Sequence, residues 1–263
     1  MLTYAIGFVQ NVQLVCFALV LGAMAWQDRS NRALRYIAAG YTSGLVGALL
    51  AFADHRLPLW LGVGLAMEAA PVGYFFFQFC VVHLTQAPYG TAPISAGHGR
   101  RTLWLSALLV IAVLPFVIAG AYQPHPDLAA TMVDLVLAVE TSLSAWLLAA
   151  STDLETRWPR RAMAIFFAAY AVVEGLRVAV YFWTGHMPGQ VAPVLEDASG
   201  FVYVVSCSVL PLAFIWMMNV RLHSHLRRMT ATDPLTNLLN RRGLEAACLA
   251  ELARAHRSRQ ELV

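Results

Sequence analysis

Long apolar stretches alternate with short polar segments along most of the chain. A helix of ~20 apolar residues crosses the hydrocarbon core of a bilayer, so the pattern predicts seven transmembrane helices. They cover residues 2–26, 33–53, 59–85, 102–122, 128–150, 162–184 and 194–220. The second and third are separated only by residues 54–58, which predicts a tight antiparallel pair. We therefore expect an all-α integral membrane protein built as a seven-helix bundle.

The arginines predict how the bundle is oriented. Eleven lie in the segments after the first, third, fifth and seventh stretches, whereas the alternate loops hold only Arg56. Basic loops stay in the cytoplasm, so we expect the N-terminus outside and the C-terminus inside a bacterial cytoplasmic (inner) membrane. The first 28 residues lack Lys and Arg, so the first stretch is expected to remain as a span and not to act as a cleaved signal peptide.

Composition supports this assignment and excludes several functions. The chain is 59% hydrophobic and 13% charged, against about 25% charged residues in soluble domains. All 18 basic residues are arginine, which excludes a retinal or pyridoxal Schiff base and a lysine-containing phosphate loop. The net charge of +3 comes from loop arginines, so we expect a lipid bilayer as partner and no nucleic acid. The four cysteines show no metal or redox spacing.

Ionisable side chains inside the predicted spans are the best candidates for a functional site, because each is expensive to insert into a membrane. The candidates are Glu68 in the third span, Glu140 in the fifth, and Glu174 and Arg177 in the sixth. Their similar depth predicts a polar cavity that opens outward and binds a small-molecule or ionic signal. The alternative is that they only hold the bundle together. Asp134, Glu196 and Asp197 lie nearer the outer edge and are expected to be solvated.

Histidines offer a weaker metal hypothesis. His55, His125 and His186 lie in or beside the outward loops, and three imidazoles with a carboxylate could hold zinc or copper. No HxxxH or HxH spacing supports such a site. Haem is also disfavoured, because His83 is the only histidine well inside a predicted span.

Small residues recur at four-residue spacing in two spans. Gly40, Gly44 and Ala48 do so in the second, and Ala171, Gly175 and Ala179 in the sixth. Such ridges let helix backbones approach closely in lipid. Chance repetition is the alternative, because Ala and Gly are abundant here.

A signalling helix is predicted to follow the last span, over residues 221–232. Ile215, Asn219, Leu222, Leu226 and Met229 have the 4-3-4-3 spacing of a coiled-coil seam. The seam predicts a homodimer, and Asn219 would favour a single register. Pro211, inside the last span, is a candidate hinge. A single amphipathic helix is the alternative.

The next segment reads Asp-Pro-Leu-Thr-Asn-Leu-Leu-Asn-Arg-Arg. It resembles the DxLTGLxNRR motif that opens the GGDEF domain of bacterial diguanylate cyclases, with Asn237 in place of the usual glycine. The matching residues are Asp233, Leu235, Thr236, Leu238, Asn240, Arg241 and Arg242. Asn240 is expected to cap a helix that begins at Arg241.

The resemblance implies that residues 1–220 are a sensor domain and that residues 233–263 are the start of an α/β catalytic domain. The family's magnesium- and GTP-binding residues would lie beyond residue 263, so we expect this chain to be catalytically incomplete. Two alternatives remain. One is an anchor that only dimerises the cyclase, and the other is a transporter of protons or polar solutes. The spans show no inverted repeat, which argues against a transporter.

Overall fold

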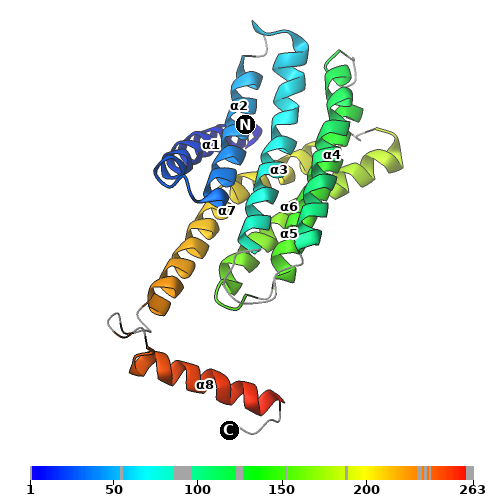
Figure 1. The fold of residues 1–263 in the computed structure, drawn as a ribbon. Coiled ribbons are helices and arrows are strands. Elements are labelled where there is room, and N and C mark those ends of the chain that lie inside the picture. Colours follow the sequence, from blue (N-terminus) through cyan, green and yellow to red (C-terminus); the bar gives the residue numbers. More distant parts are fainter. Residues whose placement is uncertain are drawn as a thin grey trace. The chain divides into compact units, whose positions relative to one another are not determined.

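The computed structural model is helical throughout the residues that it describes (Figure 1). These are residues 2–53, 56–85, 96–122, 127–151, 153–186, 189–229, 233, 236 and 238–258. The elements are α1 (Leu2–Gln27), α2 (Arg32–Phe52), the π-helical η2 (Trp60–Leu65), α3 (Ala66–Thr85), α4 (Ala96–Gly120), α5 (Asp127–Ala150), α6 (Arg157–Thr184), α7 (Ala192–Met229) and α8 (Arg241–Ser258). The chain divides into two compact units, Met1–Phe214 and Ile215–Val263.

Among the described residues, six helices are long and apolar enough to cross a membrane. They are α1, the continuous η2–α3 pair, α4, α5, α6 and α7. The prediction of an all-helical membrane protein is therefore supported at this level. The second predicted span forms α2 but is not among the six. Its 21 residues are long enough, but Arg32, Arg35 and the polar Tyr41–Ser43 segment make it less apolar.

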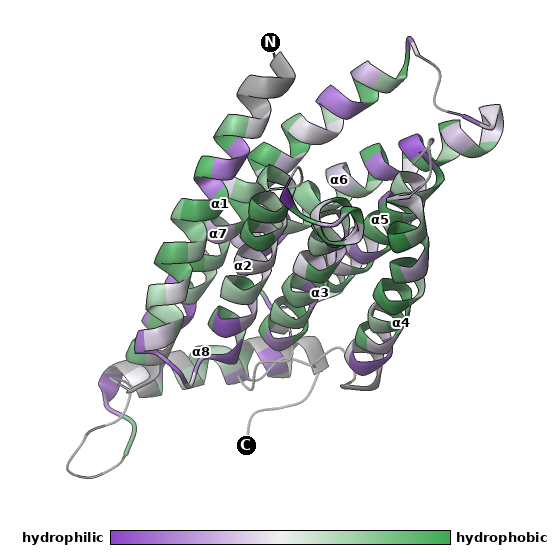
Figure 2. Ribbon diagram, turned by 90° about the horizontal axis from the view of Figure 1, so that it is seen from above, coloured by the Kyte–Doolittle hydropathy of each residue, from purple (hydrophilic) through white to green (hydrophobic). Residues whose placement is uncertain are grey.

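Many hydrophobic residues in the first unit face outward, and several ionisable ones face inward. Leu19 on α1, Ile111 on α4 and Val172 on α6 are well exposed, whereas Glu140 and Glu174 are buried. Figure 2 shows hydrophobic residues along most of α1 and α4. Ionisable groups in membrane helices face the interior of the bundle, so this distribution is the one expected of a protein surrounded by lipid.

The most extensive helix pairings in the first unit are α2 with α3 and α5 with α6. Helices α2 and α3 lie side by side (Figure 1), as the short predicted loop implies. Their close contact runs through Gly40, which faces Gly73 and Phe77, and through Gly47, which faces Ala69. A Cβ at Gly40 would stand 3.0 Å from the Gly73 carbonyl oxygen and closer still to the Phe77 ring.

The other small residues of the predicted ridges have different surroundings. Gly44 faces Leu14 of α1 and not α3. No described heavy atom lies within 4 Å of the position a Cβ would take at Gly175. The four-residue spacing therefore identified only one glycine of the close contact, Gly40. The other, Gly47, lies seven residues further on, a spacing that also keeps it on the same face of α2.

Polar side chains fix the turn between α1 and α2. The Asp28 carboxylate accepts hydrogen bonds from the hydroxyl and the amide of Ser30, at 2.6 and 3.2 Å. The hydroxyl bond in particular lowers the pKa of Asp28. The Asn31 side chain accepts from the Leu34 amide at 3.1 Å and caps α2. The arginine-bearing turn after α1 is therefore a defined structure.

Candidate functional site: buried carboxylates and the proline of α7

Side chains from three helices, two of them charged, lie around Glu174 of α6. Its side chain is 1% exposed and accepts a hydrogen bond from the Ser199 hydroxyl of α7. Arg177, one turn further along α6, has its Nε 3.8 Å from a Glu174 carboxylate oxygen and 3.1 Å from Oδ2 of Asp134 on α5. The Tyr170 side chain also interacts electrostatically with Glu174. We call Asp134, Glu174, Arg177 and Ser199 the paired cluster.

The paired cluster corrects one sequence-based expectation and adds a residue. Asp134 is buried, so the prediction that it is solvated was wrong. Its position about two turns into α5 suggested the outer edge, but the rotation of α5 turns it toward Arg177. Ser199 was not predicted, because a single serine in an apolar helix carries no distinguishing spacing. Glu196, on the same helix, is exposed as expected.

Glu68 of α3 and Glu140 of α5 form a second group of a different kind. Both are buried, and Glu140 interacts electrostatically with Glu68. Within the described part of the chain, none of their four carboxylate oxygens has a hydrogen-bond partner. We call Glu68 and Glu140 the unpaired carboxylates. Buried carboxylates without partners are strongly unfavourable when charged, so these two groups favour the neutral form or a bound polar species.

Helix α5 separates the two groups. Asp134 and Glu140 are six residues apart, which corresponds to ~9 Å along the axis and about 120° around it. Asp134 therefore faces Arg177 of α6, and Glu140 faces α3. The four predicted candidates are thus divided: Glu174 and Arg177 belong to the paired cluster, and Glu68 and Glu140 stand apart.

Pro211 lies inside α7, as predicted, and the helix continues to Met229. A proline has no amide hydrogen, so the carbonyl of the residue four positions earlier, Cys207, loses its helical partner. The Tyr41 hydroxyl of α2 donates a hydrogen bond to that carbonyl at 2.7 Å. Tyr41 is almost fully buried. A side chain from α2 therefore replaces the hydrogen bond that the proline removes from α7.

An aromatic core lies next to this bond: the Tyr41 ring packs against Phe77, which in turn packs against Tyr74. The rings of Tyr74 on α3 and Tyr170 on α6 stack at 5.3 Å, and both lie near Tyr203 of α7. Since Tyr170 also interacts electrostatically with Glu174, the aromatic core connects the paired cluster to the α7 proline region. No sequence pattern singled out these tyrosines.

The predicted coiled-coil residues belong to the second unit. Asn219, Leu222 and Leu226 are exposed, the last two at 55% and 49%. The side chain of Met229 lies outside the part that the structure describes. The described seam residues therefore present an apolar face without a partner in the single chain, which leaves the dimer prediction open.

The motif after α7 has the local structure expected at its end. The Asn240 side chain accepts a hydrogen bond from the Gly243 amide at 2.9 Å, and α8 begins at Arg241. The predicted cap is confirmed. The Asp233 amide donates to the Leu238 carbonyl at 2.8 Å. Thr236 is exposed, and Arg241 pairs with Glu245 at 3.1 Å. Leu235 and the Arg242 side chain lie outside the described residues.

The structure does not assemble a histidine site from the residues that it describes. His186 is exposed, and its Nδ1 lies 3.0 Å from the Thr184 carbonyl oxygen. His55 and His125 lie outside the described residues. Nδ1 of His83 lies 3.1 Å from the Phe79 carbonyl oxygen, and its ring packs on Tyr36. The described part of the chain contains no group of three side chains suited to a metal ion.

Comparisons of the chain with protein-family models, with curated proteins and with solved structures give no match. The resemblance to the GGDEF family therefore rests on the motif that begins at Asp233.

Proposed function

We propose that the chain is the membrane sensor and regulatory region of a diguanylate cyclase. In this proposal, seven helices including α2 cross a bacterial inner membrane, with the N-terminus outside and the C-terminus in the cytoplasm. The parent protein would carry the catalytic domain that converts GTP to cyclic di-GMP with magnesium. Two copies of the chain would meet through the α7 stalks and bring two such domains together.

The observation that carries this proposal is the Asp233–Arg242 motif directly after a long helix. The Asn240 cap and the helix that starts at Arg241 give this motif a defined local structure. The apolar seam of Leu222 and Leu226 is exposed between the apolar part of α7 and the motif. An exposed seam is suited to coiled-coil pairing.

The buried charges support a sensing role over a simple anchor. An anchor needs no ionisable groups in its interior, whereas the first unit buries four carboxylates in two groups, Asp134 with Glu174 and Glu68 with Glu140. Arg177, which pairs with the first group, is half-buried. The unpaired carboxylates are the positions in the described bundle where a polar ligand or a proton would change the energy most. We therefore assign signal recognition to Glu68 and Glu140.

The bond between Tyr41 and the Cys207 carbonyl provides a route from the bundle to the stalk. Glu68 lies on α3, which packs on α2, and Tyr41 of α2 holds α7 at its proline. A shift of α2 relative to α7 would break this bond and allow α7 to bend at Pro211. Bending there would change the register or separation of the two stalks, which a two-state switch requires.

Cyclase output from the parent protein tests the proposal. The complete coding sequence is expressed in a bacterial host, and cyclic di-GMP is measured by mass spectrometry. Leu222→Arg should lower output about 100-fold, because a lost stalk contact removes the effective concentration that brings the two domains together. Output no higher than in the empty host, from a stably expressed wild-type protein, would refute the assignment.

Single neutralising variants distinguish a sensor from an anchor. Glu68→Gln and Glu140→Gln should each change cyclase output about fivefold or more, the usual scale of coupling between sites. Ser206→Ala, which removes a buried α7 hydroxyl with no described partner, is the matched control. Unchanged output in both glutamate variants, with normal expression, would identify an anchor. Proton or solute flux through purified wild-type protein in vesicles would favour the transporter instead.

Topology is tested independently of activity. Alkaline phosphatase is active only outside the cytoplasm, and green fluorescent protein fluoresces mainly inside it. Fusions after Gly185 should show phosphatase activity, and fusions after Ser151 or Met229 should fluoresce. The opposite pattern, or both chain ends on one side, would overturn the seven-span orientation.

A further inference from the structure

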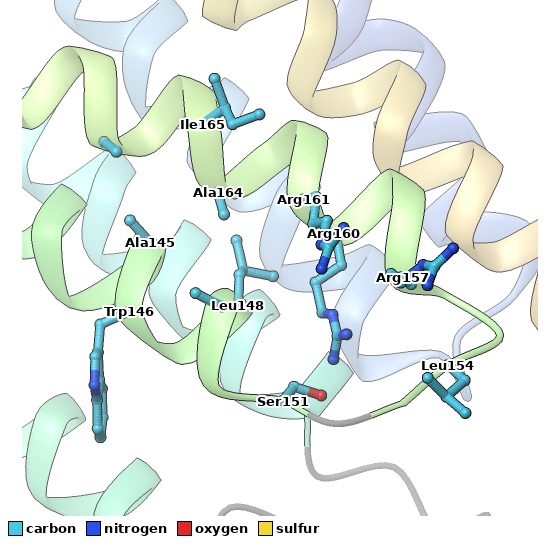
Figure 3. A pocket seen from close by; sticks show the side chains of 12 residues that line it. Ala145, Trp146, Leu148, Ser151, Leu154, Arg157, Arg160, Arg161, Ala164 and Ile165 are labelled. Carbon is cyan, nitrogen blue, oxygen red and sulfur yellow. The ribbon is translucent and has the colours of Figure 1, made fainter.

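A groove of about 910 Å³ lies between the end of α5 and the start of α6 (Figure 3). Its volume is at the upper end of the range for small-molecule sites. It lies apart from the paired cluster and the unpaired carboxylates, none of which lines it. The groove was not predicted, because its lining residues come from two helices and the turn between them.

One part of the groove is apolar. Figure 3 shows Ala145 and Leu148 of α5 near Ala164 of α6, with Ile165 further along. Trp146 and Ile165 are well exposed. Since α5 and α6 are both apolar enough to cross a membrane, this open side faces the acyl chains of lipids.

The other end of the groove is basic. Arg157, Arg160 and Arg161 lie in the first two turns of α6 and all line it. Arg160 is 7% exposed, and its Nη2 donates to the Asp153 carbonyl at 3.0 Å, which fixes the guanidinium in the wall. The guanidinium carbons of Arg157 and Arg161 lie 4.9 and 5.8 Å from the exposed ring of Trp158. Tryptophan is typical of the membrane interface.

Two acidic residues of the connecting turn, Asp153 and Glu155, do not line the groove. The Asp153 carboxylate accepts from the Thr156 hydroxyl at 2.7 Å and from the Glu155 amide at 3.0 Å. Thr156 therefore does not cap α6 with its side chain, and the positive end of the α6 dipole adds to the charge of the arginines.

We propose that this groove binds one phospholipid with an anionic headgroup. Arg157 and Arg161 contact the phosphate, which suits the planar, multiply donating guanidinium. One acyl chain lies along Ala145, Leu148 and Ile165. An apolar wall continuous with a basic end fits a molecule that has both parts, whereas a free phosphate would leave the wall unoccupied. Basic pockets between membrane helices bind anionic lipids through this same combination.

Native mass spectrometry of the full chain tests the site. The chain is released from nanodiscs of equal parts phosphatidylglycerol and phosphatidylcholine, and the retained lipid is identified. Wild type should retain one phosphatidylglycerol. The double variant Arg157→Gln/Arg161→Gln should weaken retention about 25-fold, from ~1 kcal/mol for each arginine near an anionic headgroup. The matched control, Arg100→Gln/Arg101→Gln, removes two exposed α4 arginines outside the groove and should retain the lipid.

A second pair of variants tests the apolar wall. Ala168→Trp fills the groove from an exposed position, and Ala179→Trp changes an exposed position on the same helix outside it. Only the first should lose the lipid. Equal losses in both arginine pairs would show diffuse attraction and overturn the site. Displacement of the lipid by inorganic phosphate, with no effect of Ala168→Trp, would show an anion site without a lipid and also overturn it.

Discussion

The carboxylates of the paired cluster and the unpaired carboxylates are buried to a similar degree, but only the first have hydrogen-bond and ion-pair partners in the described structure. Glu174 has a serine hydroxyl, a tyrosine and an arginine around it. Glu140, equally buried, has no hydrogen-bond partner in the described structure, and its charged neighbour is another carboxylate, Glu68. Both groups use α5, so the difference does not arise from depth or from the helix itself.

The comparison separates a structural role from a functional one. A buried ion pair with hydrogen bonds holds helices together, and removing one partner is strongly destabilising. Two buried carboxylates without partners do not hold helices together, and their burial lowers the stability of the fold. We therefore interpret the paired cluster as the part that fixes α5, α6 and α7, and the unpaired carboxylates as the part available to a signal.

The largest expected effect is that of Arg177→Gln. It leaves Asp134 and Glu174 buried without their cation, so the free energy of unfolding should fall by about 3 kcal/mol, the low end for buried pairs because Arg177 is 17% exposed. Unfolding in mixed micelles measures this. Adding Asp134→Asn and Glu174→Gln to the same chain should recover most of the loss. Arg101→Gln, at an exposed position, is the control. A loss below about 0.5 kcal/mol would remove the structural role.

Ser199→Ala should have an intermediate effect. It removes the hydroxyl that donates to Glu174, a hydrogen bond to a charged group worth about 1.5–3 kcal/mol. Ser206→Ala, on the same helix, removes a buried hydroxyl with no partner among the described residues and should change stability little. The difference between the two variants, measured in the same micelles, isolates the hydrogen bond. Equal losses would show that only packing matters.

The smallest effect is expected for Glu140→Gln. The substitution preserves the shape and breaks no hydrogen bond of the described structure, so stability should change by less than about 0.5 kcal/mol. A loss of about 2 kcal/mol or more in the purified protein would mean that Glu140 holds a bound species, and the same measurement after extensive dialysis would show whether that species is exchangeable. A large loss after dialysis would place Glu140 with the paired cluster.

Much of the helical architecture could be predicted from hydropathy. The predicted limits of the first five spans match the helices to within a few residues at most ends, because a run of apolar residues changes abruptly to Arg, Asp or Pro. The starts of α4 and α6 and the end of α7 differ more, since these three helices include adjoining polar sequence. Asn240 could be predicted as a cap because capping depends on neighbours only three residues away.

The site was harder to predict than the helices. Glu174 and Arg177 share one helix, so their spacing alone indicated a pair. The shorter ion pair, between Arg177 and Asp134, joins two helices and depends on how each helix is rotated about its axis. Tyr41 and Cys207 are 166 positions apart in the chain. No local pattern encodes such contacts, and only the packed bundle reveals them.

The bond from Tyr41 to the Cys207 carbonyl has one further consequence. Most helices are self-sufficient, since their hydrogen bonds close within one segment, but α7 depends at this point on a phenol from elsewhere in the chain. The hydrogen bonding of α7 at Pro211 therefore depends on the position of α2. Pro211 removes one hydrogen bond from α7, and the Tyr41 hydroxyl replaces it for as long as α2 stays in place. Movement of α2 would therefore remove this support reversibly.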